Sequence, residues 1–453
     1  MSLTEKRKET GSVARRVQFK DAQPHGDDIL VVGGGGREHA IVSKLRESAK
    51  VGEIYGAPGN AGMDVVETGI GATEIEKIVQ YVDTHKNIKF TVVAPDDPLA
   101  LGLVDELEKR GHRAFGPKKA AARLEWSKAY AKDVMRRYGI PTAAYGAFDS
   151  AAAATEFIRG GKFPVVVKAD GLALGKGVLI CEDEKSAMAA VEEIMTDKKF
   201  GAAGNKIIVE EFLKGYEVSL LAFSDGEHYS LMPTSCDHKR ALDGDKGLNT
   251  GGMGAYSPCP RFTEEILQKT VKTVVEPTLS AMRKEGAPFK GVLYFGLMVD
   301  GDDVRVLEYN ARFGDPETQS VLPLLKTDLY DIFNATVDGT LDRLDIEWSD
   351  KKSVNVVLAS GGYPLSYKKG CPITGLGDVS RDVNVFYAGV KREGDGLITS
   401  GGRVLCVQTV ADDFKTALDR VYANIRKIKF DGCFYRKDIG KAALDNGATC
   451  DKR

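Results

Sequence analysis

The sequence predicts a multidomain protein that combines α/β and α+β folds: an N-terminal doubly wound parallel sheet, a central module with a small lid, and a mixed C-terminal domain. Its 453 residues correspond to about three domains at roughly 150 residues each. A composition that is 43% hydrophobic and 28% charged is typical of a globular chain. Short apolar runs also alternate with helical segments near the N-terminus, which is the pattern of a parallel sheet.

Charge and cysteine usage exclude several classes of partner. With 63 Lys and Arg against 65 Asp and Glu, the chain has no net charge that would attract nucleic acid or an anionic membrane. No apolar run approaches the roughly 18 residues of a membrane span. The seven cysteines are dispersed without a CxxC pair, which indicates reduced thiols rather than disulfides or a zinc site. We therefore expect a cytoplasmic protein that binds small molecules, with no nucleic acid and no membrane partner.

The N-terminal part divides into a tail and a substrate-binding domain. Residues 1–27 are polar, lack the apolar core of a secretion signal and are predicted to be a disordered tail. Residues 28–125 alternate strands with helices as an α/β domain. In such sheets ligands bind at the carboxyl ends of the strands, where residues 33–39, 58–62 and 95–98 fall.

The remaining chain is predicted to form two further domains. One long helix is expected over residues 117–139, ending at a glycine before a proline and linking two domains. Residues 126–335 form the central domain, with a lid at about 142–213 followed by a mostly antiparallel sheet. Residues 336–453 contain short strands and one helix.

The first glycine-rich segment, GGGGREH at residues 33–39, follows a strand and opens a helix. Backbone N–H groups and the positive helix end can hold an anion there. The dinucleotide fingerprint fails, because Glu38 or His39 stands where its third glycine is needed. A phosphate-bearing metabolite therefore fits better than NAD, and a purely structural turn is the alternative. We expect His39 to be a packing residue.

The second glycine-rich segment, GLALGKG at residues 171–177, resembles a Walker A loop but is not one. Asp170 stands in place of its first glycine, and Gly177 in place of the Ser or Thr that holds Mg²⁺. A strand follows, so the segment is predicted to be a hairpin flap whose N–H groups close over phosphates. Lys168 and Lys176 place positive charge beside it. The alternative is a surface hairpin with solvated lysines.

A row of polar residues in EYNARFGDPETQ is the most informative feature. In an extended strand Glu308, Asn310 and Arg312 point to one face. Two hard oxygen ligands suit Mg²⁺ that bridges triphosphate oxygens, and Arg312 suits the developing phosphoryl charge. Asp315 follows in a loop.

Two connecting segments complete the candidate site. Residues 209–219 (VEEFLKGYEVS) can offer backbone groups to an adenine edge, with Glu217 for ribose hydroxyls. Residues 237–258 are predicted to be a long glycine-rich loop of the kind that is usually functional or disordered. Polar residues at its start are candidates to orient a small ligand: Asp237 with Lys239 or Arg240.

Together these segments resemble the ATP-grasp superfamily and, within it, the glycinamide ribonucleotide synthetase family. The resemblance runs from about Ile29 to the C-terminus, through GGGGREHA, KADGLALGKGV, DHKRALDGDKGLNTGGMGAYSP, EYNARFGDPETQ and TSGGRVL. It implies an ATP-grasp module over 126–335. It also implies a reaction of early purine synthesis, in which glycine is joined to 5-phosphoribosylamine through glycyl phosphate while ATP is cleaved to ADP and phosphate.

The resemblance implies a nucleotide and metal site. It would bind ATP with Mg²⁺ or Mn²⁺ held by Glu308 and Asn310. The expected nucleotide contacts are Lys128, Lys168, Gly175, Lys176, Gly177, Glu210, Glu211, Phe212, Leu213 and Glu217.

The resemblance also implies substrate and catalytic residues. Those expected at phosphoribosylamine are Gly35, Gly36, Arg37, Glu38, Asn60 and Asp96. Those expected at the reacting carboxylate are Gly251, Met253, Arg312 and Asp315, with Arg403 approaching the same cleft. The expected catalytic residues are Arg312, Lys176 and Asp315.

Three positions depart from the family pattern: Cys236 stands where the family usually has Gln, Leu248 replaces the usual Pro, and Asp96 occupies a position that is commonly Glu. Other interpretations stay open at this point: an ATP-grasp ligase with a different acyl acceptor, a catalytically silent nucleotide-binding regulator, and a dehydrogenase that the failed fingerprint weakens. We expect a monomer or weak dimer, with transient contact to the amidotransferase that supplies the amine.

Overall fold

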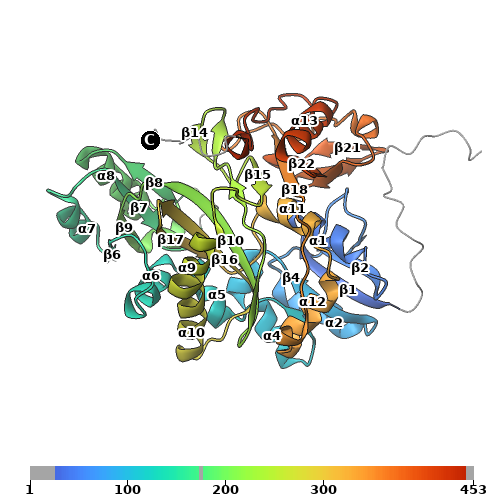
Figure 1. Cartoon of the computed structure of the whole chain (residues 1–453), viewed down its shortest axis with the longest axis horizontal. Coiled ribbons are helices and arrows are strands. Elements are labelled where there is room, and N and C mark those ends of the chain that lie inside the picture. The colour runs from blue at the N-terminus through green and yellow to red at the C-terminus, as the bar shows by residue number, and fades with distance from the viewer. Residues whose placement is uncertain (1–25, 173–176, 445–453) are drawn as a thin grey trace, which may run out of the picture.

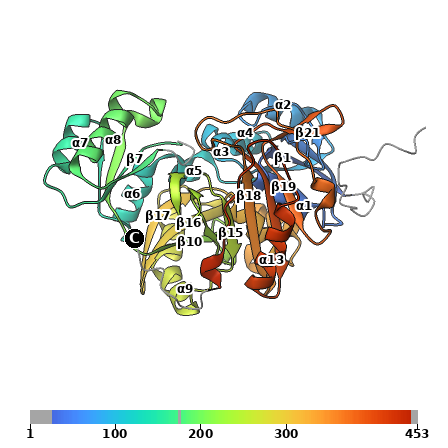
Figure 2. The ribbon, with the colours of Figure 1, turned by 90° about the horizontal axis from the view of Figure 1, so that it is seen from above.

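The computed structural model of the chain describes residues 26–172 and 177–444, and shows a lid set apart from a larger body (Figures 1 and 2). The predicted combination of a parallel N-terminal sheet, a central module with a lid and a mixed C-terminal part is confirmed. Within the described ranges, no helix is long and apolar enough to cross a membrane.

The N-terminal sheet is parallel, in the order β3-β2-β1-β4-β5. Ile29 and Val31 pack toward α1 and toward α12 (Leu329–Asp338), whereas Leu30 and Val32 pack toward α2 and α4, so helices cover both faces. β1 begins at Asp27, inside the predicted tail, because Asp27 pairs with Val51. The elements are β1 Asp27–Gly33, α1 Gly36–Leu45, β2 Val51–Pro58, β3 Val66–Glu67, α2 Ile75–Thr84, β4 Ile88–Val93, α3 Asp96–Leu101, α4 Leu103–Lys109 and β5 Ala114–Phe115.

The predicted single helix over 117–139 is wrong. The structure has two helices, α5 Lys119–Trp126 and α6 Lys128–Arg137, because Ser127 adopts an extended backbone and caps α6 by accepting a hydrogen bond from Tyr130 N (3.2 Å). The carboxylate of Asp170 also accepts from Ala129 N (2.9 Å). The break therefore ties the start of α6 to the lid.

The lid is a four-stranded sheet, in the order β6-β9-β7-β8, against which α7 and α8 pack. Its own core contains Ala154, Val167, Ile194 and Ile207. β7 and β8 form the predicted antiparallel hairpin around the second glycine-rich segment. The elements are β6 Tyr145–Phe148, α7 Ala151–Ile158, β7 Val165–Ala169, β8 Val178–Cys181, α8 Glu184–Val191, η1 Glu192–Thr196, η2 Gly201–Asn205 and β9 Ile207–Glu211.

The central sheet is antiparallel, as predicted, in the order β11-β10-β16-β17. Helices α9 and α10 pack against it, and α12 lies between this sheet and β5. The elements are β10 Tyr216–Asp225, β11 Tyr229–Leu231, α9 Glu264–Thr270, η3 Val271–Val275, α10 Glu276–Lys284, β16 Lys290–Asp300, β17 Asp303–Asn310, α11 Glu317–Val321, η4 Leu322–Leu324 and α12 Leu329–Asp338.

The C-terminal sheet, in the order β12-β15-β18-β22-β19, takes two strands from the central part of the sequence. β12 and β15 lie in residues 237–258 or at their edge, so the predicted long loop is instead divided by short strands. The predicted boundary at residue 335 falls inside α12. The elements are β12 Cys236–Asp237, β13 Arg240–Leu242, β14 Lys246–Asn249, β15 Gly254–Ser257, η5 Leu341–Arg343, β18 Lys352–Ala359, η6 Leu376–Asp378, β19 Asn384–Tyr387, β20 Val390–Glu393, β21 Gly396–Thr399, β22 Arg403–Ala411, α13 Phe414–Ile425 and η7 Lys441–Ala443.

His39 joins the N-terminal helix α1 to the C-terminal sheet. Its Nδ1 accepts a hydrogen bond from Tyr387 N (2.8 Å), and its ring contacts Phe386 edge-on. Burial lowers the pKa of His39 to about 3, so the folded protein keeps the ring neutral. The expectation of a packing residue is confirmed.

This burial predicts acid sensitivity. Because the unfolded chain takes up a proton on His39 near its ordinary pKa of about 6.5, its contribution to stability is present above that pH and is lost as the pH falls toward 3. Between pH 7.5 and 5.0 we expect this loss to be about 2 kcal/mol. His39→Asn keeps an acceptor near Nδ1 but cannot titrate. Urea unfolding should therefore show a smaller acid-induced loss in His39→Asn than in the wild type or in a His85→Asn control, and an equal loss would contradict the assignment.

Candidate active site

The candidate site forms where the N-terminal sheet, the central sheet and the C-terminal sheet meet. Arg37 of α1 donates from Nη1 to Phe313 O (3.2 Å), directly after β17. A Cβ added at Gly35 would lie 3.8 Å from Asp315 Oδ2. The first glycine-rich segment and the EYNARFGDPETQ segment, far apart in sequence, are therefore neighbours.

The predicted metal ligands lie on β17. Glu308 and Asn310 pair with Gly296 and Tyr294 of β16 and share one face of the strand. Burial pushes the pKa of Glu308 upward, but Lys239, Lys168 and Lys128 outweigh it and hold that pKa below its ordinary value. The carboxylate is therefore ionised. Among the described residues no side chain or backbone group donates a hydrogen bond to it, so its oxygens suit a hard divalent cation.

Arg312 continues the row at the end of the strand. Its Nη2 lies 2.7 Å from Glu125 Oε1 and 3.1 Å from Asn310 Oδ1, and its Nη1 donates to Phe313 O (3.2 Å). The buried Nε has no hydrogen-bond partner within the part of the chain that the structure describes. Since a buried N–H is rarely left unpaired, this edge of the guanidinium fits a ligand oxygen.

Two predicted phosphate-site lysines approach this row from the lid side. Lys128 begins α6 and donates to Gly171 O (2.9 Å). Burial and Lys168 lower the pKa of Lys128, whereas Glu308 opposes that shift. Gly177 closes the base of the flap by accepting from Ala169 N (2.9 Å). Gly175 and Lys176 lie outside the described residues.

The predicted nucleotide contacts in the lid-to-sheet connection differ in their availability. Glu210 is buried between Lys168 and Lys132, with Lys132 Nζ 2.5 Å from Oε2, so its side chain positions these lysines. Glu211 is exposed and pairs with Arg305 (2.8 Å). Phe212 and Leu213 are half-buried between β9 and β10, and Glu217 is exposed near the start of β10. These last residues can offer backbone and side-chain groups to a nucleotide.

Two of the side chains predicted to contact phosphoribosylamine, those of Glu38 and Asn60, bond to the first glycine-rich segment. Glu38 accepts from Gly35 N and from Arg37 Nε, each at 2.6 Å. Asn60 donates to Gly34 O (2.8 Å) and to Tyr387 O (2.9 Å). The Gly35 N–H is thus taken by Glu38, and Gly36, the first residue of α1, remains the candidate backbone donor to an anion at this helix end.

Asp96 lies at the start of α3, across from this segment. Burial would raise its pKa, but Arg312 and Arg37 outweigh burial and lower it. The Asp96 carboxylate therefore interacts electrostatically with Arg312 and with Arg37 of the first glycine-rich segment.

The region predicted for the reacting carboxylate is built around Arg403. Its Nη1 donates to Gly251 O (2.7 Å) and Asp315 O (2.8 Å), and its Nη2 lies 3.0 Å from Asp315 Oδ2. Arg403 therefore does reach the predicted site. Met253 does not line an open surface, because its side chain is fully buried and its backbone bonds to His238 and Val357.

Sequence reasoning missed two buried carboxylates. Glu125 comes from α5, where nothing in the local pattern separates it from a solvated helix residue. Glu317 accepts from Ser219 Oγ (3.1 Å) and Tyr294 OH (3.0 Å). Glu317 lies five residues after Arg312 in the sequence, and this closeness to the predicted row could have marked it as a site residue.

Asp237 and Lys239, singled out in the predicted loop, also reach this site. Burial raises the pKa of Asp237 to about 7, although Lys239 Nζ lies 3.0 Å away and opposes the shift. The ammonium of Lys239 in turn favours the ionised form of Glu308. Segment 237–258 therefore places a cation, Lys239, near Glu308.

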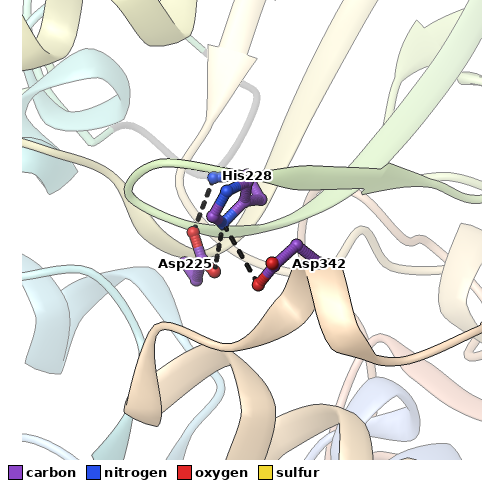
Figure 3. Close-up of side chains that lie close together, drawn as sticks. All are labelled: Asp225, His228 and Asp342. Carbon is purple, nitrogen blue, oxygen red and sulfur yellow. Dashed lines mark hydrogen bonds and ion pairs between the residues drawn. The ribbon is translucent and has the colours of Figure 1, made fainter.

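A different group of potential metal ligands lies at the opposite end of β10: Asp225, His228 and Asp342 (Figure 3). Both carboxylate oxygens of Asp225 accept hydrogen bonds from backbone N–H groups, those of Glu227 (2.9 Å), His228 (2.7 Å) and Leu341 (3.1 Å). These bonds hold the turn between β10 and β11. The group therefore has a structural role.

Family models match most of the chain. They describe the N domain, the ATP-grasp (A) domain and the C domain of phosphoribosylglycinamide synthetase, over residues 27–125, 126–318 and 353–442. A phosphoribosylamine–glycine ligase of Halalkalibacterium halodurans is 46% identical over 93% of this chain and 98% of its own length. A trifunctional purine biosynthetic protein adenosine-3 of Gallus gallus is also 46% identical, over 92% of this chain and 42% of its own length.

Solved structures agree with these matches. The structure of a phosphoribosylamine–glycine ligase from Thermotoga maritima has a TM-score of 0.80 and 33% identity, covering 91% of this chain and 100% of that one. A biotin carboxylase from Campylobacter jejuni, at 15% identity, shares the fold with a TM-score of 0.70, covering 93% of this chain and 95% of that one. The domain order, the site on β17 and these similarities together show that the chain belongs to the phosphoribosylglycinamide synthetase family of ATP-grasp enzymes.

Proposed function

We propose that this protein joins glycine to 5-phosphoribosylamine in de novo purine biosynthesis, with cleavage of ATP to ADP and phosphate through glycyl phosphate. Family membership supports the overall ATP-dependent ligation. The observation that carries the chemical route is the row of Glu308, Asn310 and Arg312, in which Lys128 and Lys168 favour the ionised form of Glu308. Phe313, the next residue after this row, accepts a hydrogen bond from Arg37 of the first glycine-rich segment.

In the first step a carboxylate oxygen of glycine attacks the γ-phosphorus of ATP, and ADP leaves with the electrons of the broken P–O bond. A Mg²⁺ or Mn²⁺ ion at Glu308 and Asn310 would neutralise charge on the phosphate oxygens. Arg312 would donate from Nε to a phosphoryl oxygen, and Lys128 and Lys168 would add positive charge from the lid side.

In the second step the amine of phosphoribosylamine attacks the acyl carbon, and inorganic phosphate leaves. The backbone N–H of Gly36 and the positive end of α1 would hold the sugar phosphate. Arg403 fixes Gly251 and Asp315 around the acyl group. A separately packed lid over the nucleotide would exclude the water that hydrolyses an acyl phosphate.

The proposed location and partners follow from the same chemistry. The enzyme would work in the cytoplasm as a monomer or weak dimer, and would receive its labile amine in transient contact with the upstream amidotransferase. Dispersed cysteines without a predicted disulfide framework support the reducing compartment.

The decisive experiment supplies ribose 5-phosphate and ammonia as a source of the amine, together with MgATP. ADP should accumulate only when glycine is also present, and glycinamide ribonucleotide should appear with it. ADP release that ignores glycine would favour another ATP-grasp ligase, and tight MgATP binding without turnover would favour a silent regulator.

Removing the charge of Glu308 should impair phosphoryl transfer. We expect Glu308→Gln to lower kcat on the order of 100-fold and to raise the Mg²⁺ concentration for half-maximal rate, while the melting temperature changes little. Asp303→Asn, at the exposed start of the same strand, is the control. An unchanged Mg²⁺ titration in Glu308→Gln would remove Glu308 from the metal site.

Replacing Arg403 should disturb the acyl-group region. Since a lysine cannot span Gly251 O and both groups of Asp315, Arg403→Lys should raise the KM for glycine by roughly 10-fold and leave the KM for ATP near normal. Arg420→Lys, on α13, is the matched control. Equal rises in both KM values would argue against this placement.

A further inference from the structure

Glu125 makes contacts that the proposed reaction does not use. We propose that Glu125 is a positioning residue that holds the guanidinium of Arg312 in place for phosphoryl transfer. This inference rests on the proposed function, because it assigns a role to a residue that acts through Arg312.

Both oxygens of Glu125 hold the same short segment after β17. Oε1 lies 2.7 Å from Arg312 Nη2, and Oε2 accepts from Ala311 N (2.7 Å). One carboxylate therefore fixes the backbone before the arginine and the side chain of the arginine itself. The Glu125 side chain is only 7% exposed and that of Arg312 18%, so water competes little for these bonds.

The remaining contacts of Arg312 show what this anchor leaves free. Nη1 bonds to Phe313 O, and Nη2 also reaches Asn310 Oδ1. Nε is buried and has no partner among the described residues. Because the guanidinium is planar, holding its Nη2 corner sets the direction in which Nε–H points. Among the described residues, the hydrogen-bond acceptors that would remain without Glu125 are the neutral oxygens of Phe313 and Asn310.

Structural stability alone does not account for this arrangement. Burial raises the pKa of Glu125 to about 7, with Arg312 opposing and Asp96 reinforcing the shift, while Ala311 N and Arg37 also oppose it. A buried ion pair contributes little net stability, since desolvation offsets most of the attraction. An orienting role for a charged group at the reacting centre does account for it.

The position of α5 gives this contact a further consequence. α5 packs against α3, whose first residue is Asp96, and against β17. Glu125 reaches Arg312 from the helix that also packs against α3. The direction of Arg312 thus depends on the packing between the substrate-binding sheet and the ATP-grasp sheet.

A double-mutant cycle tests the proposal. Glu125→Gln should lower kcat on the order of 10-fold to 100-fold while the KM for ATP changes less than about 3-fold. Arg312→Met should lower kcat on the order of 100-fold to 1,000-fold. If Glu125 acts through Arg312, the double variant should be no slower than Arg312→Met, because residues that act as a unit are not additive. Multiplied losses would overturn the proposal.

Controls separate this role from a loss of folding. Glu108→Gln, in a partly exposed ion pair on the neighbouring α4, should leave kcat unchanged. MgATP binding by calorimetry and a thermal melt check the fold of each variant. If Glu125→Gln does not fold, Glu125→Asp keeps the charge and enters the same cycle with the same criterion. Absence of glycine-dependent ADP release in the wild type would instead reject the proposed function.

Discussion

The structure depends on a balance of charge in a desolvated site. Glu308 stays ionised because Lys239, Lys168 and Lys128 surround it, and the Glu125 carboxylate lies 2.7 Å from the guanidinium of Arg312. Each carboxylate is buried enough that loss of its cationic neighbour would drive it toward protonation. The site therefore requires its lysines, arginines and carboxylates together, although they come from the lid, the central sheet and the helix that precedes them.

Much of this could be predicted from sequence where the signal is local. Glu308, Asn310 and Arg312 share a face because a strand repeats every two residues, and the glycine-rich segments follow strands as anion-binding turns do. The break between α5 and α6 could also have been predicted locally, because Ser127 is a preferred N-cap residue. The helical periodicity continues on both sides of Ser127, so the pattern indicated one helix. Local patterns therefore identified the components of the site.

What could not be predicted depends on contacts between distant segments. Glu125 and Arg312 are far apart in sequence, and no periodicity indicates that a residue of α5 ends beside β17. Met253 was expected beside the reacting carboxylate, yet its side chain is part of the buried core. Glu38 was expected to contact substrate, and its carboxylate accepts a hydrogen bond from Gly35 N in the same turn. Likewise, β15 forms as a strand by pairing with the distant β18, and β12 by pairing with β15, so neither could be predicted from residues 237–258 alone.

The departures from the family pattern can now be judged by position. Leu248 is about half exposed on β14, so its replacement of a proline removes no buried contact. Cys236 is buried in β12, pairs with Tyr256 of β15, and directly precedes Asp237, whose carboxylate lies 3.0 Å from Lys239 Nζ. Asp96 is the departure with the most direct effect on charge, because an acid shorter than glutamate interacts there with Arg312 and Arg37. A carboxylate at this position still attracts both arginines, since electrostatic attraction weakens gradually with distance, whereas a hydrogen bond is lost within a few tenths of an ångström. The charge balance that the site requires is thus retained in this chain.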